Sequence, residues 1–227
     1  MSKDEWLLNA AWGPRADDLE TCANRLDCFL RAIAAVDSSL ARWQRSGDRS
    51  GTPITPDSLV NLLAGGTHRT DDPSHRPIPD LGWTIGLFNG LRDNASEMTI
   101  TCGSTFSQVG NSIHWTLPLG GLRDGSFPLD ATMTLVEAVL TSWEPDWTTV
   151  VSFNHLTAQS RAWYQHTFGW IVYLTAKLRP KLRPMPPPAT VTDYHGGKLV
   201  VATPRAEEVT TELLEEVSAR IELGSSR

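Results

Sequence analysis

The sequence predicts an α+β fold in which amphipathic helices cover one face of a mostly antiparallel sheet. The first observation is the stretch 82–117, where apolar and polar residues alternate in three short runs. Alternation with a period of two places apolar side chains on one face of a strand and polar side chains on the other. The second observation is a pair of helical patterns, one before this stretch and one after it, each with a single apolar stripe. Together they predict a central three-strand meander whose apolar face is covered by helices.

The three strands of the meander share this alternation. Their apolar positions are Trp83, Ile85 and Leu87, then Met98, Ile100 and Cys102, then Ile113, Trp115 and Leu117. The two connections, 91–96 and 104–110, contain the Gly, Asn, Asp and Ser residues that tight turns favour.

The chain before the meander begins with a predicted strand at 6–12, which Gly13-Pro14 ends. Apolar residues then recur every three or four positions from Leu19 to Ile33, which predicts a half-buried helix with Asp17 and Asp18 near its positively polarised start. We expect the following segments to be a short helix carrying Leu40 and Trp43, a polar loop at 46–56, a helix over 59–63 ended by Gly65-Gly66, and a second polar loop at 67–80.

The chain after the meander continues with a helix that Asp130 is predicted to cap and that buries the apolar positions between Leu135 and Trp143. Strands at 147–153 and 170–174 are expected next, with a short helix at 158–164 between them. Gly196-Gly197 is predicted to turn a hairpin between strands at 191–194 and 198–202. The last helix is expected to start at Thr203-Pro204 and to bury Val209, Leu213 and Val217.

The chain of 227 residues contains no linker long and polar enough to separate two cores, so we expect one domain over 1–227. Prolines near 180–188 predict a stiff connector inside it. No apolar run approaches the roughly 20 residues of a membrane span, and no apolar leader is evident, which favours a cytoplasmic protein. Three cysteines without a CxxC pair favour reduced thiols.

The net charge of −6 and the pI of about 5.5 disfavour direct binding of nucleic acid, which normally requires a basic face. The same acidity suits a basic protein partner. The loop from His68 to Asp72 and His75 contains residue types that bind metals, but its spacing matches no zinc or calcium motif. We therefore expect no metal and no cofactor, and we regard this exposed loop as a better candidate for partner contact.

An enzyme is the alternative function, using either Cys102 or the loop that carries His68 and His75. Cys102 and His114 are the residue types of a nucleophile and its base. The alternation nevertheless places Cys102 on the apolar face of the sheet and His114 on the polar face, where the two side chains cannot meet. The binding function is favoured over catalysis for this reason.

A series of short motifs runs through about residues 6–202. They are 12–15 (WGPR), 20–25, Phe29-Leu30, 40–43, 59–63, 66–69, 81–90, 101–103, Gly110-Asn111, 143–147 and 169–174. In this order and spacing they resemble the immunity protein 52 family of bacterial polymorphic toxin systems. The proline-rich connector and the glutamate-rich last helix lie outside the resemblance.

The resemblance implies a non-enzymatic inhibitor that binds and neutralises a cognate toxin domain, typically a restriction-endonuclease-like nuclease, and so protects the producing cell. Two modes of inhibition fit: acidic loops cover the active site of the toxin, or the inhibitor binds elsewhere and blocks dimerisation or folding. We expect the contacts on or beside the loops that flank the meander. The candidate contact residues are Asp71, Asp72, Trp83, Arg92, Asp93 and Glu97.

Overall fold

The computed structural model describes residues 5–48, 50–108, 110–118, 128–159 and 166–224. Its strands are β1 (Trp6–Trp12), β2 (Gln44–Arg45), β3 (Trp83–Phe88), β4 (Glu97–Cys102), β5 (Asn111–Thr116), β6 (Trp147–Ser152), β7 (Ile171–Thr175), β8 (Lys181–Leu182), β9 (Thr190–Tyr194), β10 (Gly197–Val201) and β11 (Ile221–Glu222). Its α-helices are α1 (Leu19–Ala34), α2 (Leu59–Ala64), α3 (Leu129–Trp143), α4 (Phe153–Ala158) and α5 (Thr211–Ala219). Within these residues, no helix has the length and apolar character that crossing a membrane requires.

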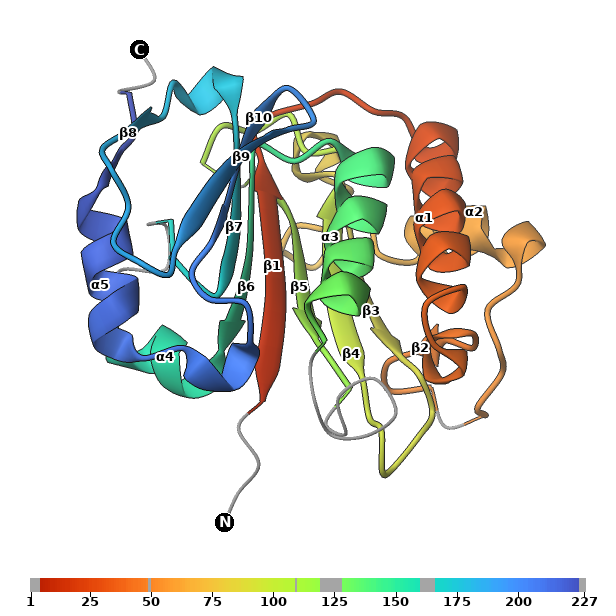
Figure 1. Ribbon diagram of the computed structural model, residues 1–227. Coiled ribbons are helices and arrows are strands. Elements are labelled where there is room, and N and C mark those ends of the chain that lie inside the picture. The colour runs from red at the N-terminus through yellow and green to blue at the C-terminus, as the bar shows by residue number, and fades with distance from the viewer. Residues whose placement is uncertain (1–4, 49, 109, 119–127, 160–165, 225–227) are drawn as a thin grey trace.

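A nine-stranded sheet in the order β2-β3-β4-β5-β1-β6-β7-β10-β9 organises the chain, and β1 lies in its middle (Figure 1). All pairings described between these strands are antiparallel. Leu8 of β1 lies opposite Trp115 of β5 on one side and Val150 of β6 on the other. The predicted α+β class and the antiparallel meander, β3 to β5, are confirmed.

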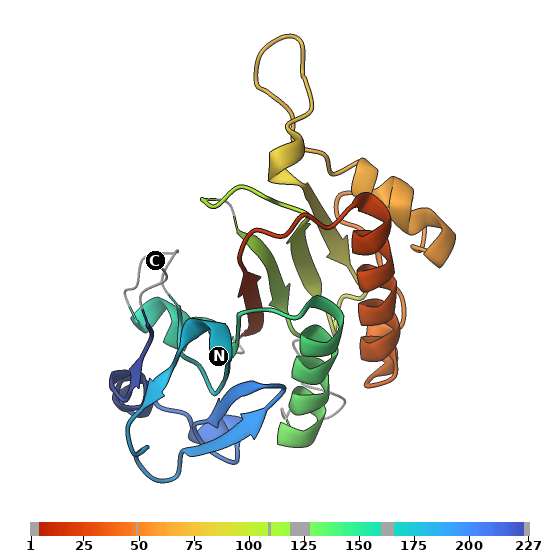
Figure 2. The same ribbon diagram turned by 90° about the horizontal axis from the view of Figure 1, so that it is seen from above.

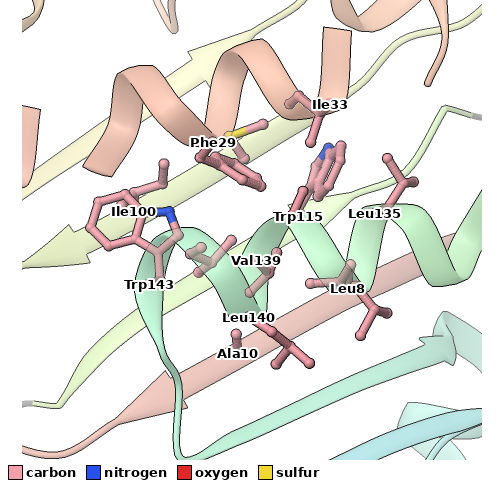
Figure 3. Close-up of a cluster of buried hydrophobic side chains, with 14 of the residues drawn as sticks. Leu8, Ala10, Phe29, Ile33, Ile100, Trp115, Leu135, Val139, Leu140 and Trp143 are labelled. Atoms are coloured by element: carbon pink, nitrogen blue, oxygen red, sulfur yellow. The ribbon is translucent and has the colours of Figure 1, made fainter. Parts of the chain in front are cut away.

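The two faces of the sheet are covered by different helices. α1, α2 and α3 lie on one side of the sheet, whereas α4 and α5 lie on the other side, beside β6 and β7 (Figures 1 and 2). The main core therefore forms between the meander, β1 and the helices α1 and α3, and Trp115 is fully buried within it (Figure 3). The Trp115 ring meets Phe29 edge-on at 5.7 Å, and its indole N–H donates to Ser96 Oγ at 2.8 Å.

A smaller core lies on the opposite face of β6, β7 and β10. Val172, Leu174 and Val200 point to this side of the sheet and pack with Val217 of α5 and Ile221 of β11. The proline-rich segment joins this core through Leu182 and Met185. Strands β6, β7 and β10 are thus covered on both faces, which explains why every residue of β6 is buried.

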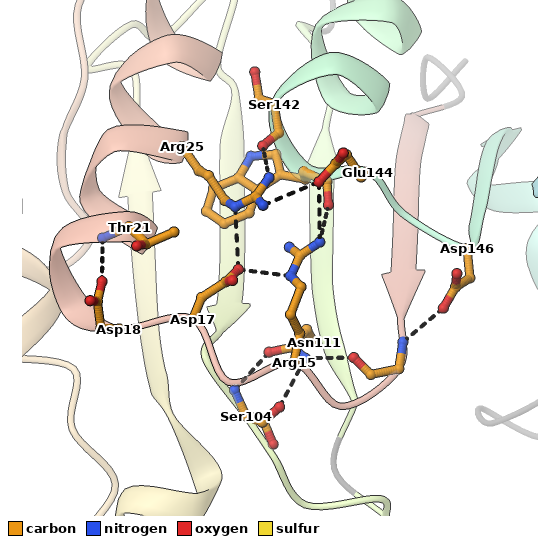
Figure 4. Close-up of polar contacts among 12 residues, drawn as sticks. Arg15, Asp17, Asp18, Thr21, Arg25, Ser104, Asn111, Ser142, Glu144 and Asp146 are labelled. Carbon is orange, nitrogen blue, oxygen red and sulfur yellow. Dashed lines mark hydrogen bonds and ion pairs between the residues drawn. The ribbon is translucent and has the colours of Figure 1, made fainter. Parts of the chain in front are cut away.

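Two arginines join the end of β1 to the ends of α1 and α3 (Figure 4). Arg15 Nη1 donates to the carbonyl of Trp143, and Arg25 Nη1 donates to the carbonyl of Ser142, each at 2.9 Å. These carbonyls belong to the last turn of α3, where no intrahelical donor is available. Asp17 Oδ2 lies 2.7 Å from Arg15 Nε and 3.2 Å from Arg25 Nε, and Glu144 Oε2 lies 3.9 Å from Arg15 Nη1 and 3.1 Å from Arg25 Nη2, so two carboxylates each pair with both cations.

Three predicted helix boundaries are wrong. α3 has Pro128 as its N-cap, and Asp130 lies inside its first turn. The last helix begins at Thr211, because Val209 is extended and Thr210 Oγ1 accepts the N–H of Leu213 at 3.2 Å. The segment after Leu40 leaves its single 3-10 turn (Ser38–Leu40) and enters β2, so Trp43 is not helical.

The predicted hairpin turn is displaced by one residue. Gly197 pairs with Tyr194, which leaves His195 and Gly196 as the two loop residues. Both have positive φ, 44° and 69°, as a tight two-residue turn with matching twist requires. The structure describes only residues 158 and 159 of the helix predicted at 158–164, and Ala158 is the last residue of α4. Residues 160–164 lie outside the described part.

Glu137 fixes the β9–β10 hairpin to α3. The Tyr194 hydroxyl donates to Glu137 Oε2, and His195 Nε2 lies 2.7 Å from Glu137 Oε1. Desolvation raises the pKa of Glu137, but the hydrogen bonds from Tyr194 and His195 outweigh it and lower the pKa. Burial, together with the bond to Glu137, raises the pKa of Tyr194 to about 12.

We expect Arg25→Met to lower the free energy of unfolding by about 1–3 kcal/mol, because the Ser142 carbonyl and Asp17 lose a charged donor. Urea unfolding monitored by tryptophan fluorescence measures the change. Arg31→Met is the matched control on the same helix: Arg31 is 71% exposed and forms a surface ion pair with Asp27, so its loss should cost less than about 0.5 kcal/mol. Equal effects of the two substitutions would contradict a structural role for Arg25.

Glu137→Gln should destabilise the fold near neutral pH, and the difference from wild type should disappear in acid. Because the folded-state pKa of Glu137 is lowered from 4.5, its carboxylate stabilises the fold above that value and loses this effect as the pH falls through the lowered pKa. Thermal unfolding of both proteins at a series of pH values from neutral into acid tests this. A difference that is constant with pH would show that the carboxylate is not responsible.

Candidate partner-binding site

The 67–80 loop projects from the sheet at the start of β3 (Figure 2). Two β-bridges hold its base: Thr67 pairs with Trp83, and Arg69 pairs with Pro77. Gly82, which joins the loop to β3, has a φ of +64°, and a Cβ there would lie 2.2 Å from the Cys102 carbonyl oxygen. Only glycine therefore permits this close approach between the loop and β4.

Asp71 and Asp72 lie together at the tip of this loop but differ in their contacts. Asp72 accepts hydrogen bonds from the Ser74 hydroxyl and from its backbone N–H, and these bonds lower the pKa of Asp72. Arg76 Nη2 also lies 3.6 Å from Asp72. Asp71 is exposed and has no ion pair or side-chain hydrogen bond with a described residue. Asp71 is thus the freer of the two carboxylates.

Trp83 is half-buried at the same end of the sheet and packs against the main core. A Cβ on Gly103, whose φ is +73°, would lie 2.3 Å from the Trp83 ring. The ring is therefore seated against the backbone of the β4–β5 connection, and only part of it faces solvent.

Arg92 and Asp93 are exposed on the turn between β3 and β4, which Asn89 organises. The buried Asn89 side chain accepts the backbone N–H of Ser96 at 3.0 Å and donates to the Asn94 carbonyl at 2.7 Å. This structural role of Asn89 was not predicted, although an asparagine directly after a strand is typical of such turns.

The structure divides the candidate contact residues into two groups at opposite ends of β3. Trp83 begins this strand, with Asp71 and Asp72 in the loop before it, whereas Arg92, Asp93 and Glu97 follow its end. Six residues of β-strand span about 20 Å. One small patch therefore does not contain all six residues.

Cys102 and His114 are not brought together. Cys102 is fully buried on the helix-covered face, where its hydrogen bond with Cys22 and its burial raise its pKa. His114 lies on the opposite face, 3.1 Å from Asn9 Oδ1 through Nδ1, and desolvation lowers its pKa. A protonated thiol without a nearby base is a poor nucleophile.

The histidines of the 67–80 loop also have separate surroundings. His68 Nε2 lies 2.9 Å from Thr84 Oγ1, at the base of the loop, whereas His75 is exposed. In the described part of the chain, no three or more His, Cys, Asp or Glu residues are grouped as a metal ion would require.

The meander and β1 share a second surface, the polar face, which points away from α1 and α3. Its side chains alternate with the buried ones and are mostly hydroxyl or amide groups, with Glu97 and His114 among them. The polar side of the meander was predicted. Its shape was not, because that depends on β1 and β6, which lie far from the meander in sequence.

The polar face forms the floor of a hollow of about 830 Å³. Asn9, Thr99 and His114 line its floor. Ser46 and Gly86 line it on the β2–β3 side, and Trp147, Leu156 and Thr167 on the side of β6 and α4. The hollow extends along β4 and β5 from Glu97 and Thr116 at one end to Gln108 and Asn111 at the other. It therefore extends from Glu97, a member of one group of predicted contact residues, toward the end of the sheet where the other group lies.

Comparison with known proteins gives one family match: the model described as immunity protein 52 matches residues 4–221. A search of curated proteins gives no significant match. Among solved structures, the chain is similar to the Pseudomonas aeruginosa T6SS protein PA0821, with a TM-score of 0.49 and 9% sequence identity over 94% of this chain and 76% of that chain. The family match confirms the resemblance found in the sequence.

Thiol labelling of the native protein should modify Cys28 rapidly and leave Cys22 and Cys102 unmodified until the protein unfolds. Cys28 is exposed, whereas the other two sulfurs are buried together beneath α1. An absorbance assay with an aromatic disulfide reagent counts the reactive thiols before and after denaturation. Cys28→Ser provides the control and should lack the rapid phase. Rapid labelling of Cys102 in folded Cys28→Ser would revive a catalytic role for this residue.

Proposed function

The chain belongs to the immunity protein 52 family, and from this premise we propose that it binds a cognate bacterial toxin domain and neutralises it in the cytoplasm of the cell that makes both proteins. The single observation that carries the proposal is the family match, which extends over residues 4–221 and so includes both halves of the sheet. The role is one of binding, and it requires a stable surface that is complementary to the toxin.

The toxin that we propose is a nuclease of the restriction-endonuclease type. Such an enzyme holds DNA on a basic surface, and the net charge of −6 on this chain is complementary to that surface. Opposite charges accelerate association as well as stabilise the complex, which is useful to a protein that must bind its toxin before DNA is cut. We propose that the inhibitor covers the DNA-binding surface of the toxin, in preference to blocking toxin dimerisation or folding.

The predicted contact residues provide acidic groups at both ends of the polar face. Asp71 lies at the tip of the 67–80 loop, and Asp93 lies on the β3–β4 turn; both are exposed and without an ion partner among the described residues. A toxin that spans the polar face would reach both ends. Asp72, Arg92 and Glu97 adjoin these positions, and the half-buried Trp83 would contribute only its solvent-facing edge.

Co-expression with the toxin encoded by the adjacent gene tests the function. The wild-type protein should restore growth, co-elute with a catalytically inactive form of the toxin and prevent that form from binding DNA. Failure of all three would refute the proposed function. A complex that still binds DNA would instead show that inhibition occurs away from the DNA-binding surface.

Reversal of charge at both ends, Asp71→Lys with Asp93→Lys, should weaken toxin binding at least about tenfold, because two attractive contacts become repulsive. Isothermal titration calorimetry with the inactive toxin measures the affinity. Asp57→Lys is the control: Asp57 is also exposed and without an ion partner among the described residues, but it lies beside α2. Equal loss of affinity with this control would indicate a general effect of charge and exclude a local contact.

A further inference from the structure

The polar face is open over the meander. The residues opposite it, such as Ile100 and Ile113, are covered by α1 and α3, whereas Thr99 and His114 on the polar face are exposed. On this side of the sheet, α5 packs over β7 and β10, away from the meander (Figure 1). No described helix lies over the polar sides of β3, β4 and β5.

The charged side chain that lines the hollow on this face is negative. Glu97 is its one carboxylate among the described lining residues, and those residues include no lysine or arginine. The two histidines of this lining are His114 and His166; desolvation lowers the pKa of His114, which disfavours the charged form of this side chain near neutral pH. The rest of the lining supplies hydrogen-bond groups such as Asn9 and Thr99 and apolar groups such as Leu7 and Ala11.

Glu97 also lacks a partner among the described residues, unlike several other surface carboxylates. Asp193 pairs with Lys198, Glu208 with Arg205 and Glu222 with Arg183. Glu97 has no ion pair and no side-chain hydrogen bond with any described residue. A carboxylate at the edge of a hollow whose described lining contains no lysine or arginine is able to pair with a cation supplied from outside.

We propose that this hollow receives a segment of the toxin that carries a lysine or arginine, and that the cation of this side chain pairs with Glu97. The inference rests on the proposed function and assigns a surface and a chemistry to the contact. An anionic occupant is disfavoured, because the described lining offers it Glu97 and no lysine or arginine. A second copy of this chain is disfavoured by its own charge of −6.

Two substitutions test the site with the inactive toxin as the probe. Glu97→Gln keeps the shape of the side chain and removes its charge, so the affinity should fall about tenfold or more. Thr99→Arg lies two residues along β4 on the same face, where it fills the hollow and supplies its own cation; the affinity should fall about a hundredfold. Both residues are exposed, so the unfolding midpoint should not change.

Glu215→Gln is the matched control, because Glu215 is an exposed carboxylate on α5, likewise without a partner among the described residues, and its loss should leave the affinity unchanged. If Glu97→Gln and Thr99→Arg bind the toxin as tightly as wild type does, the hollow is not the contact, although the proposed function stands. If the wild-type protein fails to bind the toxin, both proposals fail. A wild-type dimer that Thr99→Arg converts to a monomer would overturn this inference in favour of a second copy as the occupant.

Discussion

The pairing of β1 on both of its edges is the constraint on which the rest of the structure depends. β5 and β6 each align with β1 over six residues, although they lie about a hundred or more positions further along the chain. Without β1, the meander and the C-terminal strands would be two separate sheets with unpaired edges. The chain leaves β1 directly into the segment that carries Arg15 and Asp17, so the same strand also sets the position of α1 relative to α3.

This arrangement produces two kinds of strand in one sheet. β6, β7 and β10 have apolar residues on both faces, because α3 and neighbouring segments cover one face and α5 covers the other. The meander strands bury apolar residues on one face, the side that α1 and α3 cover, and Phe88 is an apolar residue on their other face. The polar face is therefore a direct result of how many helices the chain provides and where β1 places them. A large, rigid and solvent-facing surface remains beside a well-packed core.

The sequence was sufficient for features that depend on neighbouring residues and insufficient for those that depend on distant ones. Alternation in 83–88, 97–102 and 111–116 identified the meander, and the apolar stripe from Leu19 to Ile33 identified α1. Thr203-Pro204 is a good helix start in isolation, but in the structure the Thr203 carbonyl accepts the indole N–H of Trp170 at 2.8 Å, and the chain forms only a 3-10 turn (Ala206–Glu208) before α5 begins at Thr211. The hollow needed the register of β1 with β5 and β6, which no local pattern encodes.

The rigidity of the polar face bears on how a binding protein of this kind can be tight. Association is opposed by the ordering of loops and side chains, and a surface that is already fixed by strand pairing loses little further freedom. The lining of the hollow includes short Thr, Ser and Asn side chains on paired strands, which carry little conformational entropy, together with apolar residues such as Leu7 and Ala11. The loop that contains Asp71 is held by the hydrogen bond from the Ser74 N–H to Asp72, and the turn that contains Asp93 is held by the hydrogen bond from the Ser96 N–H to Asn89. A charged partner that meets this surface therefore contacts groups that are already in place. Little of the free energy of electrostatic attraction is then lost to reorganising the surface.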